Sequence, residues 1–96
     1  MHSALFVAKV ANTLPATWRT FLEKAKVGLR TYKNVLRLAE NVWIVDLQKN
    51  PAPFGHLVAA ADAAGVPYGI LPFEYEPQWL PVGFDPKTIE GRNEET

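Results

Sequence analysis

The sequence of 96 residues contains no cysteine. A disulfide framework, a thiolate metal site and a cysteine nucleophile are therefore excluded. Long hydrophobic runs are also absent: residues 4–8 and 42–45 form strand-length runs, far below the ~18 residues of a membrane span. The first residues lack the charged segment and apolar run of a signal peptide. We therefore expect a cytoplasmic protein with no membrane association.

Residue patterns that carry catalysis are scarce. The sequence has no glycine-rich phosphate loop, no Gly-x-Ser-x-Gly turn and no paired histidines. His56 falls in the first turn of a predicted helix, where we interpret it as a surface or capping residue rather than a base. Asp46, Glu74 and Glu76 are too few for a metal site, and edge-strand charges also prevent aggregation. We predict no catalytic residues, no metal and no cofactor.

Zero net charge conceals an uneven distribution along the chain. Residues 1–49 hold eight Lys and Arg against three Asp and Glu, a net +5, whereas residues 50–96 hold two against seven, a net −5. Such asymmetry fits a nucleic-acid face, self-association or an acidic tail. The apolar share of 48% is typical of a globular domain with one core.

Hydrophobic periodicity predicts six elements. Residues 4–10 are rich in strand formers. From Leu14 to a helix end near Gly28, apolar residues recur on one helix face, after an N-cap pair at Asn12 and Thr13. Residues 32–47 predict a hairpin and residues 68–76 a last strand. Between them lies a second helix, with Asn50 and Pro51 at its start and Gly65 as its C-cap.

The hairpin is predicted to turn at Glu40 and Asn41, which pairs Ala39 with Val42. Alternation along the strands then sorts the side chains into two faces. The face expected against the helices carries Leu36, Leu38, Trp43, Val45 and Leu47. The opposite, open face carries Lys33, Val35, Arg37, Val42, Ile44, Asp46 and Gln48.

The order strand, helix, strand, strand, helix, strand predicts a ferredoxin-like α+β two-layer sandwich, in which two helices cover one face of a four-stranded antiparallel sheet. The first and third strands should be central. Pro67 and Pro72 place the fourth strand at an edge. We expect one domain over residues 1–84, including an aromatic arm at residues 77–84, and a mobile polar tail at residues 85–96.

The open face of this sheet is the predicted site of function. Several apolar residues there would form an exposed patch of a few hundred Å², the size at which a binding surface is the better explanation. We predict a small non-catalytic domain that binds a protein partner or a second copy, unless the arm itself covers the face. The first strand is expected to contribute Phe6, Ala8 and Val10 to this face. The predicted interaction residues are Phe6, Val35, Arg37, Val42, Ile44, Trp79 and Phe84.

Two alternatives stay open. A nucleic acid would bind a basic surface on the first helix and the residues after it, although a solvated helix face with an Arg19–Glu23 pair explains the same charges. A small enzyme or ligand-binding protein would have a pocket between sheet and helices, near Trp43, His56 and Tyr68. The predicted nucleic-acid contacts are Arg19, Lys24, Lys26, Arg30, Lys33 and Arg37.

Overall fold

The computed structural model describes residues 1–76 and residue 78. The predicted aromatic arm and polar tail, with Trp79 and Phe84, lie outside the described residues, apart from Gln78. The elements are β1 (Ser3–Ala8), α1 (Pro15–Leu29), β2 (Val35–Ala39), β3 (Val42–Asp46), α2 (Ala52–Ala64) and β4 (Tyr68–Phe73).

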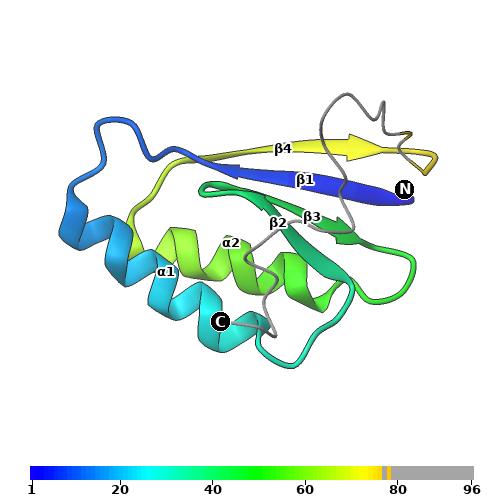
Figure 1. Ribbon diagram of the computed structural model, residues 1–96, viewed down its shortest axis with the longest axis horizontal. Helices are drawn as coiled ribbons and strands as arrows, with labels where there is room; N and C mark the ends of the chain where they lie inside the picture. Colours follow the sequence, from blue (N-terminus) through cyan, green and yellow to red (C-terminus); the bar gives the residue numbers. More distant parts are fainter. Residues whose placement is uncertain (77, 79–96) are drawn as a thin grey trace.

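These elements form a ferredoxin-like α+β sandwich. The sheet order is β2-β3-β1-β4, and each neighbouring pair of strands is antiparallel. Figure 1 shows both helices on the same face of the sheet. The predicted fold class and the central position of the first and third strands are therefore confirmed.

β4 lies at an edge of the sheet, where proline is tolerated because it has no N–H to donate. The backbone N–H of Lys9 donates to the carbonyl oxygen of Pro67 at 2.8 Å, and β1 and β4 then continue in one antiparallel register. Hydrogen-bonded pairs alternate with unbonded pairs from that point. Pro72, which pairs with Ala4, therefore falls in an unbonded pair, and its missing N–H would face the free edge.

Both helices begin differently from the prediction. The N-cap of α1 is Leu14, without a side-chain cap. Asn12 instead takes a left-handed φ of 64°, and the Thr13 hydroxyl donates to the carbonyl oxygen of Lys9 at 2.6 Å. These two residues shape the loop before α1, so the predicted N-cap pair is wrong.

The start of α2 is displaced by one residue, whereas its end is as predicted. Its N-cap is Pro51, but the side-chain oxygen of Asn50 still accepts a hydrogen bond from the backbone N–H of Ala52 at 3.0 Å. Gly65 ends the helix with φ 77°, a conformation that costs glycine little.

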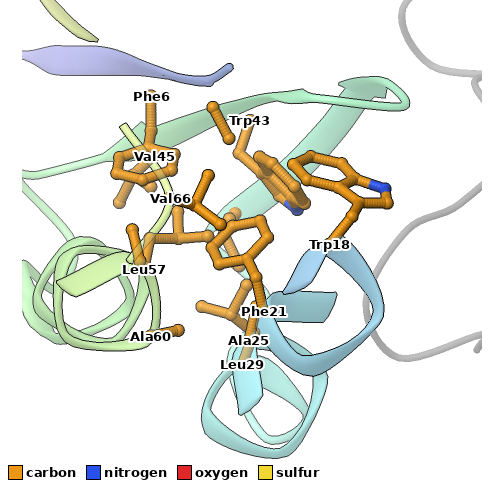
Figure 2. Packing of buried hydrophobic residues seen from close by; sticks show 13 residues of the cluster. Phe6, Trp18, Phe21, Ala25, Leu29, Trp43, Val45, Leu57, Ala60 and Val66 are labelled. Atoms are coloured by element: carbon orange, nitrogen blue, oxygen red, sulfur yellow. The ribbon is translucent and has the colours of Figure 1, made fainter. Parts of the chain in front are cut away.

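The core lies between the sheet and the helices, and Phe6 is one of its members (Figure 2). This side chain is fully buried. Its ring centroid lies 6.3 Å from that of Phe21, 6.1 Å from Trp43, 6.4 Å from Phe54 and 5.0 Å from Tyr68. Aromatic pairs at these distances stabilise the core beyond the burial of their area.

The predicted face of β1 is wrong. Phe6 and Ala8 point into the core, and Val10 packs partly against it, although all three were expected on the open face. Phe6 pairs with Trp43, and paired residues share a face of the sheet. Trp43 lies in the core, so the residue that pairs with it on β1 must also face the core. The pairing of β1 with β3 therefore determines which side of β1 is buried.

The hairpin has the predicted turn but a different register. Ala39 pairs with Val42 as expected, whereas Arg37 pairs with Trp43, so Leu38 is an extra residue in a β-bulge. Beyond the bulge every β2 side chain is on the face opposite to its prediction. Val35 is therefore in the core, with 3% of its surface exposed, and Leu36 is on the open face.

Two asparagines hold the two ends of this hairpin. The amide group of Asn41 donates to the carbonyl oxygen of Ala8 at 2.9 Å and fixes the turn against β1. At the other end, the amide group of Asn34 donates to the carbonyl oxygens of Asp46 and Asn50, at 2.8 and 2.7 Å. The side chains of Asn34 and Asn41 therefore tie both ends of the hairpin to neighbouring backbone.

Candidate interaction face of the sheet

Four aliphatic side chains, one from each strand, form a continuous row across the face that the helices leave free. Leu36 of β2 pairs with Ile44 of β3. Ile44 also pairs with Leu5 of β1, and Leu5 pairs on its other side with Leu71 of β4. We call these four residues the aliphatic row. At a strand spacing of ~4.8 Å, the row is about 14 Å long.

Further apolar side chains lie next to the row. Val7 pairs with Val42 on one side of the aliphatic row, and Ser3 pairs with Asp46 on its other side. Leu71 and Val7 have 54% and 37% of their surface exposed. The open face is defined here as the aliphatic row together with Ser3, Val7, Val42, Asp46, Gly69 and Phe73.

Only part of the predicted interaction set lies on this face. Val42 and Ile44 are on it, as predicted, and their role in binding stays a prediction. Phe6 and Val35 are buried on the helix side, so their placement on the open face is wrong. Leu5 and Leu71 lie on this face but are not in the predicted set. Their place in the row depends on the alignment of four strands, which no local sequence pattern reveals.

Arg37 also lies on the helix side, because it pairs with Trp43. Its guanidinium carbon lies 5.2 Å from the centroid of the Trp43 ring, a cation–π contact. Its Nε and one terminal nitrogen donate to the carbonyl oxygen of Glu40, at 3.2 and 2.6 Å. Burial lowers the pKa of Arg37, and the charge of Glu40 partly opposes this effect. Its placement on the open face is therefore also wrong.

The predicted nucleic-acid contacts are not all brought together. Arg19, Lys26 and Arg30 are exposed and follow one stripe of α1 and its C-cap, because steps of seven and four residues return to the same side of a helix. Lys24 is also exposed but lies about 140° around the helix from Arg19. Lys33 is exposed in the next loop, whereas Arg37 is held over Trp43.

Within residues 1–76, the three residues predicted around an interior pocket are not brought together: two pack in the core and one is exposed on a helix. Trp43 and Tyr68 both pack against the Phe6 ring. His56 is exposed on α2, with its Nε2 atom 3.5 Å from the hydroxyl oxygen of Tyr32. The helices are close here, since a Cβ atom on Gly28 would lie 3.0 Å from that of His56.

Tyr68 has a raised pKa. Removal of its hydroxyl from solvent contributes most, followed by the negative charge of Asp62 on α2 and a hydrogen bond to that carboxylate. Its phenol therefore stays neutral at higher pH than an ordinary tyrosine, which suits a ring that stacks on Phe6.

Within residues 1–76 and 78, no helix is long and apolar enough to span a membrane. In the same part of the chain, no three His, Asp or Glu side chains are grouped so that they would hold a metal ion.

Comparison with protein-family models, with curated proteins and with solved structures finds no match to this chain. Its function is therefore inferred from the geometry of its own residues.

Proposed function

We propose that this protein is a non-catalytic interaction domain that pairs with a second copy of itself through the open face of its sheet. The observation that carries the proposal is the aliphatic row, which crosses all four strands without a polar interruption. Monomeric proteins rarely leave a continuous apolar patch of this kind in water. Burial of the row against another apolar surface would remove that cost.

A second copy is favoured as the partner because the open face is complementary to itself. Asp46 lies at one end of the face, and Lys9, two residues beyond Val7 on β1, lies at the other. In such a dimer the two sheets would stack face to face, related by a two-fold axis that runs along the aliphatic row. The strands of the partner would then run in the opposite direction. Asp46 of each copy would then face the Lys9 end of the other, and aliphatic side chains would meet aliphatic side chains.

The test is the solution mass measured by light scattering behind a sizing column at several protein concentrations. The wild-type protein should reach about twice the chain mass of 10.7 kDa. Ile44→Glu should reduce this to the mass of one chain, because it places a charge in the middle of the apolar interface. Leu71→Glu should act in the same way and carries less risk to the fold, because Leu71 is half exposed.

The matched control is Val27→Glu. Val27 is an exposed aliphatic residue on α1, with 66% of its surface accessible, and lies on the helix side of the molecule. This variant has the same new charge and should remain a dimer. Circular dichroism serves to check that each variant is folded. A wild-type protein that is monomeric at every concentration, or a dimer that survives both Ile44→Glu and Leu71→Glu, would refute the proposal.

A second function, nucleic-acid binding, is favoured by the stripe of Arg19, Lys26 and Arg30 on α1, since all three side chains are exposed. It predicts that binding of a mixed-sequence DNA or RNA duplex weakens steeply as salt is added. Reversal of two charges, in Lys26→Glu with Arg30→Glu, should abolish this binding in a fluorescence anisotropy titration. Binding that is absent or insensitive to salt would rule the function out.

A further inference from the structure

A pocket of about 290 Å³ opens at the Asp46 end of the open face. Leu36 and Ile44 of the aliphatic row form part of its wall, and the exposed Lys33 and Lys49 line it as well. This volume is at the small end of the range for ligand sites, roughly 300–1,000 Å³. The pocket therefore suits a small molecule with an apolar part.

Two buried polar atoms in the wall of this pocket have no hydrogen-bond partner among the residues that the structure describes. They are the hydroxyl oxygen of Ser3 and the Nδ1 atom of His2. Ser3 has only 2% of its surface exposed, and alternation along β1 places its side chain on the same face as Leu5. A buried hydroxyl without a partner is unfavourable, and a ligand in the pocket would supply the missing partner.

Two lysines of the pocket offer partners for an anionic group on that ligand. Lys33 and Lys49 flank the side formed by β2 and β3. Asp46 lies between them, but its Oδ1 atom accepts the backbone N–H groups of Gln48 and Lys49, at 3.0 and 3.3 Å. Glu76, which follows β4, also lines the pocket, so the lining holds two carboxylates as well as two lysines. Lys33 and Lys49 lie on the same side of the pocket as its aliphatic wall, which β2 and β3 form.

We propose that this pocket binds a small monocarboxylate with an aliphatic chain. The carboxylate accepts hydrogen bonds from the lysines and the Ser3 hydroxyl, and the chain lies on Leu36 and Ile44. Leu36 and Ile44 also belong to the proposed dimer interface, so the ligand and a second copy would compete for them. The titrations therefore use Leu71→Glu, which should be monomeric and leaves every residue of the pocket unchanged. The proposal does not rest on self-association, because calorimetry and amide chemical shifts report the ligand itself.

The probe is isocaproate, and isocaproamide is its neutral counterpart of nearly the same shape. Isothermal titration calorimetry should show binding of isocaproate and at least about tenfold weaker binding of the amide, since a charge-assisted hydrogen bond is lost. Amide chemical shifts should change around Ser3, Leu36 and Ile44. Lys33→Gln with Lys49→Gln should weaken isocaproate binding, whereas Lys24→Gln with Lys26→Gln on α1 should not.

Ser3→Ala separates a ligand-binding role from a structural one. Removal of an unpartnered hydroxyl should raise the melting temperature of the ligand-free protein while it weakens isocaproate binding. A hydroxyl with only a structural role would give a lower melting temperature instead. Three results would each overturn the proposal: a lower melting temperature for Ser3→Ala, equal binding of isocaproate and isocaproamide, or no binding of isocaproate.

Discussion

Phe6→Ala is expected to lower the free energy of unfolding by about 4 kcal/mol. A domain of this size is stable by only about 5–15 kcal/mol, so the variant should lose a large part of its stability. The loss is large because the Phe6 side chain is fully buried and its ring lies against four other aromatic rings from β3, β4 and both helices. Urea denaturation followed by circular dichroism measures the change.

The control for this prediction is the next residue along β1. Val7 points to the open face, where it is 37% exposed, so Val7→Ala should cost less than about 1 kcal/mol in the monomer. Two variants that differ by one position would then differ severalfold in their effect. Equal losses, or a larger loss for Val7→Ala, would show that the faces of β1 are assigned the wrong way round.

Val35→Asp should prevent folding, whereas Leu36→Asp should leave the monomer folded. Val35 is 3% exposed in the core, where an unpaired carboxylate would be buried at a cost of several kcal/mol. Leu36 is half-buried on the open face, where a carboxylate keeps contact with water. Circular dichroism and the dispersion of amide resonances distinguish the folded from the unfolded chain.

This pair of variants tests the bulge at Leu38 directly. A hairpin without the bulge would place Leu36 opposite Val45 in the core and Val35 on the open face. The effects of the two aspartates would then be exchanged. A folded Val35→Asp protein together with an unfolded Leu36→Asp protein would contradict the register described above.

Part of the candidate site could be predicted from the chain alone. The turn at Glu40 and Asn41 places Ala39 opposite Val42, and β3 alternates without interruption from there. Val42 and Ile44 were therefore expected on the open face and lie there. The pocket next to Ser3 could not be predicted, because its wall comes from segments that are distant in sequence.

The sequence by itself determined the order of the elements, the position of β4 at an edge and hence the fold class. These features follow from local periodicity and from where proline and glycine are tolerated. The faces of β1 and β2 were decided only in the tertiary structure. β1 is apolar on both sides, so its pairing with β3 determines the buried side, and the bulge in β2 shifts the pairing of that strand with β3 by one residue. Side chains alternate between the two faces of a strand, so one extra residue moves the side chains beyond it to the opposite face. Local sequence does not encode which face is then buried.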